Sequence, residues 1–210
     1  MENTKTKRLV GIALMGAIAF VISMIEFPLF PTTPFLKIDF SDIPIFFGMY
    51  VFGPAGGVII AFIRSLLSYI SGGGDAGFPI GSTASFVASV SLTLPIYYII
   101  INKTLTLGRK FFAGLVATIS LTVMLGILNY FFVLPAYLTV MGFDISSVTG
   151  SMRNYIIYFL IPFNIIKGGL VSSIIFIMYE RMKSWLIKQR CALGTESTSQ
   201  HSNSNISIHS

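Results

Sequence analysis

The sequence predicts an all-α polytopic membrane protein with six transmembrane helices and both termini in the cytoplasm. Three observations support this fold class. Of the 210 residues, 54% are apolar and only 10% are charged, whereas roughly 25% of the residues in a soluble domain are charged. The apolar residues form runs long enough to cross a bilayer, and basic residues flank these runs. Although the net charge is +6, this placement is typical of cytoplasmic loops and argues against a nucleic-acid-binding protein.

The apolar runs cover residues 9–27, 43–70, 81–101, 111–138 and 155–179. The first run follows a basic N-terminus but continues too far for a cleaved signal peptide, so we expect an uncleaved first helix. The second run is interrupted by Gly, Pro and Ala over residues 53–57. It either crosses the membrane once, which gives five spans, or forms a hairpin of two short helices, which gives six.

The distribution of charge favours the hairpin. Three basic clusters should lie on the cytoplasmic side of the membrane. They comprise Lys5, Lys7, Arg8, Lys103, Arg109, Lys110, Arg181, Lys183, Lys188 and Arg190. The remaining connections carry Asp39 and Asp42 with Lys37, Asp75 alone, or Asp144 with Arg153, and we expect them outside. The second run therefore begins and ends outside, and it must turn back inside the membrane at Gly53.

The first arm of this hairpin is a short helix of about eleven residues that starts at Ile43. At about 1.5 Å per residue it cannot cross a hydrocarbon core of about 30 Å. It must therefore pack against protein or line a cavity. Short segments interrupted by Gly or Pro indicate binding sites in transporters, and the alternative is an irregular hairpin with a structural role only.

We expect three regions along the chain. Residues 1–8 form a cytoplasmic N-terminus, residues 9–180 the six-helix transmembrane domain, and residues 181–210 a cytoplasmic tail that is first basic and then disordered. The only histidines, His201 and His209, lie in that tail, and the sequence has no phosphate-loop or metalloprotease motif. The single Cys191 can form no intrachain disulfide. We therefore expect no catalytic residues, no metal site and no cofactor.

Lys167 is the most informative residue, because it lies midway along the last apolar run, where a charge costs roughly 2.5 to 3.5 kcal/mol. Asn164 precedes it by three positions and shares its helical face, and Pro162 removes a backbone donor just before them. Asn129 is a further amide within an apolar run. Together these side chains predict a polar floor for a small organic ligand. The alternative is that they form structural hydrogen bonds between helices.

Two other charges and one pair of alanines need an explanation. Arg64 and Glu26 lie on the outer halves of their spans, and one hypothesis is an ion pair between them. Ala13 and Ala17 in the first helix have the spacing that permits close approach of another helix. That helix belongs either to this chain or to another membrane subunit.

Four segments carry a resemblance to a known family. They are Leu-Lys-Ile-Asp-Phe-Ser-Asp-Ile-Pro at 36–44, Phe-Gly-Pro-Ala-Gly-Gly at 52–57, Asn-Tyr-Phe at 129–131 with Pro135 and Tyr137, and Pro-Phe-Asn-Ile-Ile-Lys-Gly at 162–168. In these segments, and over about residues 9–180, the chain resembles the riboflavin-specific substrate-binding subunit, or S component, of energy-coupling factor vitamin transporters. The first and last segments are fairly specific to the riboflavin branch, whereas the alanine spacing is shared by S components generally.

The resemblance implies a six-helix protein of the cell membrane that captures riboflavin from outside, with the first extracellular loop as a lid. By this analogy the substrate-binding residues are Leu36, Lys37, Asp39, Phe40, Asn129, Asn164 and Lys167. The first four belong to the lid, and the last three hydrogen-bond the flavin. Ala13 and Ala17 dock on a transmembrane coupling subunit, which two cytoplasmic ATPase subunits drive. The missing phosphate loop fits this division of labour.

The sequence departs from the family pattern at one place. The family commonly carries Gly-Glu-x-Ala-Asn-Phe where its fourth helix begins, whereas residues 81–86 read Gly-Ser-Thr-Ala-Ser-Phe. Ser82 and Ser85 thus replace a carboxylate and an amide, which leaves open an S component for another vitamin or for a flavin analogue such as FMN. A non-transport assembly subunit and an intramembrane enzyme are the alternatives from other classes.

Overall fold

The computed structural model describes residues 2–29, 36–75, 77–101, 103, 105–142 and 150–193. The tip of the expected lid, the expected outer loop around Asp144 and the expected disordered tail beyond residue 193 lie outside these ranges. The elements are α1 (Glu2–Ser23), β1 (Phe27–Pro28), β2 (Lys37–Ile38), α2 (Asp42–Gly72), α3 (Ile80–Ile100), α4 (Leu107–Leu128), η1 (Asn129–Val133), α5 (Leu134–Met141), α7 (Met152–Tyr155), η2 (Ile156–Leu160) and α8 (Ile161–Ala192).

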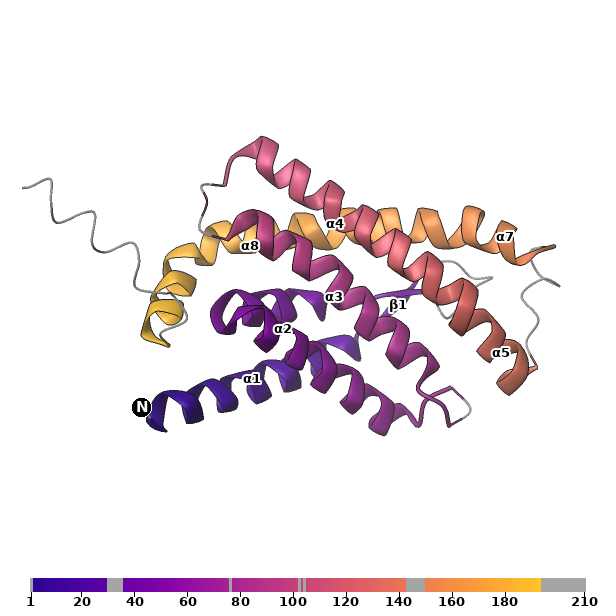
Figure 1. Cartoon of the computed structure of the whole chain (residues 1–210), viewed down its shortest axis with the longest axis horizontal. Coiled ribbons are helices and arrows are strands. Elements are labelled where there is room, and N and C mark those ends of the chain that lie inside the picture. Colours follow the sequence, from indigo (N-terminus) through magenta and orange to yellow (C-terminus); the bar gives the residue numbers. More distant parts are fainter. Residues whose placement is uncertain are drawn as a thin grey trace, which may run out of the picture.

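Five of the described helical stretches are long and apolar enough to cross a membrane. They are Thr4–Ser23, Asp42–Gly72, Ile80–Ile100, Leu107–Val140 and Arg153–Ala192. Each coincides with one of the five apolar runs, so the all-α membrane class is confirmed. Two of the stretches contain a π-helical segment, η1 or η2, with wider turns than an α-helix. Figure 1 shows the helices extending along the long axis of the molecule.

The helix α2 reverses its direction at Gly53. This residue has φ 84° and ψ 174°, a conformation that only glycine adopts readily. A Cβ atom on Gly48 would overlap the side chain of Ile60, although residues twelve positions apart in a straight helix are about 18 Å apart. The two arms of α2 therefore lie against each other, as the Gly53 break predicts.

The arms of α2 form the centre of the bundle. Phe46, Met49 and Ile60 from these arms are completely buried. On one side α1 packs closely against α2, where a Cβ atom on Gly16 would come within 2.7 Å of Ile63. On the other side α3 and α8 contact α2, and α4 contacts both α3 and α8. Most side chains of α2 are consequently inside the protein rather than in contact with lipid.

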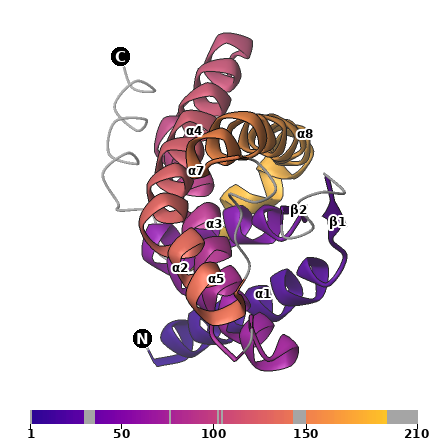
Figure 2. The same cartoon turned by 90° about the vertical axis from the view of Figure 1, so that its right-hand side faces the viewer.

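The connection from α1 to α2 forms a short antiparallel ribbon. Phe27 pairs with Ile38, and Pro28 pairs with Lys37. Figure 2 shows this ribbon of β1 and β2 between α1 and α8. The ribbon ends directly before Asp39 and Asp42, and it thereby delivers both carboxylates to the beginning of α2.

Candidate functional site

Four charged side chains meet inside the helix bundle. Asp39 Oδ2 lies 3.1 Å from Arg64 Nη2 and 3.6 Å from Lys167 Nζ, and Asp42 Oδ2 lies 3.7 Å from the same Lys167 nitrogen. The four residues are only 1% to 6% exposed. Since an unpaired charge is very costly to bury, each cation here requires a carboxylate. These four residues, which we call the charged cluster, carry two positive and two negative charges.

The reversal of α2 at Gly53 makes the charged cluster possible. Asp39 and Asp42 lie at the beginning of the first arm, whereas Arg64 lies on the second arm. Folding the arms together brings residues 39 and 64 into contact. Lys167 joins them from α8, which packs against α2. Three segments that are distant in sequence therefore supply the charges.

Hydroxyl groups orient both carboxylates. The Ser41 backbone N–H donates to Asp39 Oδ1 over 2.9 Å, and the Ser41 hydroxyl donates to the same oxygen. The Ser89 hydroxyl donates to Asp42 Oδ1 over 2.5 Å. In each carboxylate the second oxygen, Oδ2, is then the one that faces the cations. The cluster is thus fixed by hydrogen bonds as well as by charge.

The protonation of Asp39 reflects two opposing effects. Burial alone would raise the pKa of its carboxyl group. The charges of Lys167 and Arg64, together with the hydrogen bonds from Ser41, outweigh burial and lower the pKa from its ordinary 3.8 to about 2. Asp39 is therefore ionised at every physiological pH.

A small cavity of about 90 Å³ adjoins the charged cluster. It is bounded by β2 and the residue before it, by α3, by the stretch from α4 to α5, and by η2 and α8. Its lining residues are Leu36, Lys37, Gly81, Ala84, Ser85, Ala88, Leu125, Asn129, Val133, Tyr137, Leu160, Phe163 and Lys167. The wall is thus mainly apolar, with a few polar side chains, which is the usual composition of a site for a small organic molecule.

Two buried amides lie near Lys167. Asn129 is the first residue of η1, and its amide nitrogen donates to the Leu125 carbonyl over 2.9 Å. Asn164 lies one helical turn before Lys167, is 0% exposed, and has no hydrogen-bond partner for either side-chain atom among the described residues. Because a buried polar group without a partner costs about 1 to 3 kcal/mol, the amide of Asn164 is suited to receive a polar ligand.

The predicted substrate-binding residues gather around this cavity in part. Leu36, Lys37, Asn129 and Lys167 line the cavity. The remaining three do not line the cavity. Asp39 belongs to the charged cluster, Asn164 is buried one helical turn before Lys167, and Phe40 is half-buried. Contact of any of the seven with a ligand stays a prediction.

The hypothesis of an ion pair between Glu26 and Arg64 is wrong. Glu26 pairs with Lys37, and Arg64 pairs with Asp39. The ribbon of β1 and β2 holds Lys37 close to Glu26, while the reversal of α2 presents Arg64 to the inside of the bundle. The partner of each charge is therefore set by how the chain folds back at the ribbon and at Gly53, rather than by depth in the membrane.

Sequence reasoning missed Asp42 and Ser89 as parts of the site. A signal was available, because Arg64 and Lys167 are two cations within apolar runs and therefore require two buried anions. Asp39 and Asp42 are the acidic residues that border the short arm. Nothing comparable in the sequence points to Ser89.

The predicted docking residues lie on the exposed surface of α1 and do not line the cavity. Ala13 and Ala17 are exposed on α1, as are the large apolar side chains of Leu14, Ile18 and Val21. Internal packing of α1 instead uses Gly11 and Gly16, which lie against Phe52 and Ile63. The alanine pair is thus available to another subunit, and its docking role stays a prediction.

Comparison with known proteins identifies the family. The profile of "ECF transporter, substrate-specific component" matches residues 7–179. The chain belongs to this family. Substrate-specific components of ECF transporters are transport proteins, so this one is not an enzyme.

Individual relatives of this ECF component cover almost the same length. It is 39% identical to the riboflavin transporter RibU of Staphylococcus aureus over 89% of the chain and 95% of the relative. It is 33% identical to the riboflavin transporter FmnP of Bacillus subtilis over 90% of the chain and 98% of the relative. It also resembles the solved S component of a bacterial ECF transporter, with a TM-score of 0.70 and 38% identity over 87% of this chain and 98% of that one.

Proposed function

We propose that this multi-pass protein of the cell membrane binds riboflavin and mediates its uptake as the S component of an ECF transporter. The support from comparison is that the relatives are riboflavin transporters and that the chain covers 95% and 98% of their lengths. The support from the site is chemical, and it rests on the residues around the small cavity.

The observation that carries the proposal is the presence of buried amide and ammonium groups beside an apolar cavity. Riboflavin has a flat aromatic ring system with a uracil-like edge of carbonyl acceptors and one N–H donor. The side chains of Asn129 and Asn164 can both donate and accept hydrogen bonds, and Lys167 can donate three. Asn164 has no other partner among the described residues, so the flavin edge would satisfy it. The apolar walls would hold the ring system.

Binding requires the cavity to widen. Its volume of about 90 Å³ is well below the roughly 300 Å³ at which ligand cavities begin. The lid segment with Leu36, Lys37, Asp39 and Phe40 is the part that we expect to move, because it joins the bundle through a two-stranded ribbon and the ion pairs of Asp39. Outward movement would break these ion pairs, and closure over the flavin would restore them.

The proposed topology has six transmembrane helices, with both termini in the cytoplasm. The two arms of α2 on either side of Gly53 count as two of these helices, the first of them short. Residues 1–8 and 181–210 are then cytoplasmic, and residues 9–180 form the substrate-binding domain. The lid and the binding site are reached from outside the cell, as uptake requires.

Energy for uptake is proposed to come from other subunits, since the sequence contains no phosphate loop. The exposed face of α1 with Ala13 and Ala17 would dock on a transmembrane coupling subunit, because small residues allow close helix approach. Two cytoplasmic ATPase subunits would drive that coupling subunit.

The test is a flavin-binding measurement on the purified protein. The visible absorption spectrum shows whether flavin copurifies, and quenching of riboflavin fluorescence gives the dissociation constant of the ligand-free protein. Asn164→Ala removes an amide without changing any charge, and we expect about tenfold weaker binding or more. Lys7→Ala, which alters an exposed residue of α1, should bind like the wild type. A folded, colourless protein that leaves riboflavin fluorescence unchanged would overturn the proposal.

A second candidate ligand is FMN or another vitamin. The observation in its favour is that Ser85, which stands where the family commonly has an amide, lines the cavity. Competition against bound riboflavin distinguishes the two, because a physiological FMN carrier should release riboflavin at FMN concentrations no higher than those of riboflavin itself. Weaker competition by FMN would favour riboflavin.

A further inference from the structure

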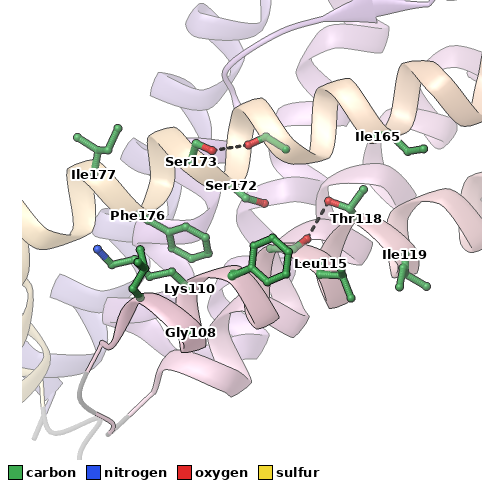
Figure 3. A pocket seen from close by; sticks show the side chains of 14 residues that line it. Gly108, Lys110, Leu115, Thr118, Ile119, Ile165, Ser172, Ser173, Phe176 and Ile177 are labelled. Carbon is green, nitrogen blue, oxygen red and sulfur yellow. Dashed lines mark hydrogen bonds between the residues drawn. The ribbon is translucent and has the colours of Figure 1, made fainter.

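A second, larger hollow lies away from the riboflavin site. It is a groove of about 1000 Å³ between α4 and α8. Its lining residues are Leu107, Gly108, Lys110, Phe111, Gly114, Leu115, Thr118, Ile119, Ile165, Gly169, Ser172, Ser173, Phe176 and Ile177. None of them lines the small cavity. Figure 3 shows Lys110 and Gly108 at one end of the groove and Ile119 and Ile165 toward the other.

The groove lies along the contact between α4 and α8, which pack most tightly near Thr118 and less tightly toward the beginning of α4. A Cβ atom on Gly168 would lie 2.5 Å from Thr118 Oγ1, whereas one on Gly114 would lie 3.5 Å from the Phe176 side chain. A Cβ atom on the neighbouring Gly169 would meet nothing within 4 Å. Figure 1 shows α4 crossing α8 and separating from it toward the beginning of α4. The floor of the groove therefore consists of small residues, and its walls of large apolar ones.

The walls of the groove face the surface of the bundle. Phe111, Leu115, Ile119, Ile165 and Ile177 are between 45% and 74% exposed. In a membrane-spanning protein such a surface contacts lipid. Hydrocarbon chains, not water, fill apolar hollows at this depth, because water would find almost no hydrogen-bond partner there.

One end of the groove is basic, unlike the rest. Lys110 lines it and forms an ion pair of 2.5 Å with Glu180 of α8. Lys183 lies seven residues beyond Phe176, two helical turns along the same face of α8. Two cations, Lys110 and Lys183, therefore lie at this end of the groove with one carboxylate, Glu180. The groove is thus apolar along its length and positive at one end.

A buried hydroxyl lies between the basic end and the apolar part. Ser172 is 1% exposed, lines the groove, and has no hydrogen-bond partner for its Oγ atom among the described residues. Its Cβ lies 3.7 Å from the position of a Cβ atom on Gly114, which is one turn, about 6 Å, along α4 from Lys110. In a phospholipid the ester carbonyls follow the phosphate at the beginning of the acyl chains. A hydroxyl one turn below a cation suits that arrangement.

We propose that this groove binds an anionic phospholipid of the membrane. The acyl chain lies along the small residues of the floor, the ester carbonyl accepts from Ser172, and the phosphate lies at Lys110. The order of chemical groups along the groove matches the order along one lipid molecule, and basic pockets between transmembrane helices are known to select anionic head groups. A transmembrane helix of another protein would use the small residues but would leave the charged end without a function.

The proposal is tested with the full-length protein in vesicles that contain equal amounts of phosphatidylglycerol and phosphatidylcholine with identical acyl chains. After extraction in mild detergent, native mass spectrometry gives the ratio of the two lipids retained. We expect phosphatidylglycerol in excess. Lys110→Gln should lower this ratio roughly fivefold, whereas Lys7→Gln, the same charge change on α1, should leave it unaltered.

A second pair of variants tests the apolar part of the groove. Gly169→Leu adds a side chain into open space in the groove, and it should reduce retention of both lipids. Gly126→Leu is the matched control, since a Cβ atom there also meets nothing within 4 Å and the residue does not line the groove. Both variants should still bind riboflavin, so that failure here is separate from failure of the proposed transport function. Equal retention of the two lipids, indifference to Lys110→Gln, or a retained protein in place of lipid would overturn the proposal.

Discussion

Replacing Asp39 by Asn tests whether the lid is fastened by charge. In the wild type, the Asp39 carboxylate lies 3.1 Å from Arg64 and 3.6 Å from Lys167. At the effective dielectric constant of about 20 that suits such sites, each attraction is about 5 kcal/mol before desolvation is subtracted. Asp39→Asn leaves the buried side chains of Asp42, Arg64 and Lys167, which together carry a net positive charge. Since breaking a buried pair costs about 3 to 5 kcal/mol, we expect the free energy of unfolding to fall by about that amount.

The assay is denaturant unfolding in detergent micelles, followed by circular dichroism. Glu26→Gln is the matched control, because it also removes a carboxylate from an ion pair, but the side chains of Glu26 and Lys37 are 42% and 41% exposed. Exposed pairs contribute about 0.2 to 1 kcal/mol. The variant Asp39→Asn combined with Lys167→Gln leaves one buried carboxylate, Asp42, and one buried cation, Arg64, so that the charges balance. Its loss of unfolding free energy should therefore be smaller than the sum of the two single losses. Equal losses for Asp39→Asn and Glu26→Gln, or strict additivity in the double variant, would refute the reasoning.

Two further predictions concern the same arm of the fold. Because the pKa of Asp39 is lowered from 3.8 to about 2 in the folded protein, its stabilising contribution is fully present above about pH 4 to 5 and is lost as the pH falls through about 2. The free energy of unfolding measured from pH 5 to 8 should therefore show no pH dependence that arises from Asp39, and the loss of stability between pH 4 and 2 should be smaller in Asp39→Asn. A titration of stability near pH 6 that this variant abolishes would contradict the assignment. Gly53→Ala places a Cβ atom at φ 84° and ψ 174°, which costs about 1 to 3 kcal/mol. Gly126→Ala, within the helical part of α4, should stabilise the protein by up to about 1 kcal/mol. Equal thermal midpoints for these two variants would show that Gly53 accepts a side chain without backbone strain.

The membrane spans of this protein could be predicted from its sequence, whereas the contacts between distant residues could not. The five apolar runs match the five long helices because burial in lipid or protein requires an apolar stretch whatever the packing. The break at Gly53 could be predicted because Gly followed by Pro interrupts a helix for local reasons. The ion-pair partners of Arg64 and Glu26 could not be predicted from the sequence, since each partner depends on how another segment of the chain folds back. The π-helical segments η1 and η2 have no clear sequence signal.

The sequence by itself determined that this chain crosses a membrane, where its charges gather along the chain, and that Asn164 and Lys167 share one helical face. These properties follow from composition and from the fixed period of the α-helix, which do not depend on tertiary contacts. Only the tertiary structure decided that Lys167 is neutralised by Asp39 and Asp42, and that α4 and α8 diverge to leave a groove with a basic end. The physical reason is that charge pairing and helix crossing depend on distances between residues far apart in sequence, and the reversal of α2 and the packing of α8 set those distances.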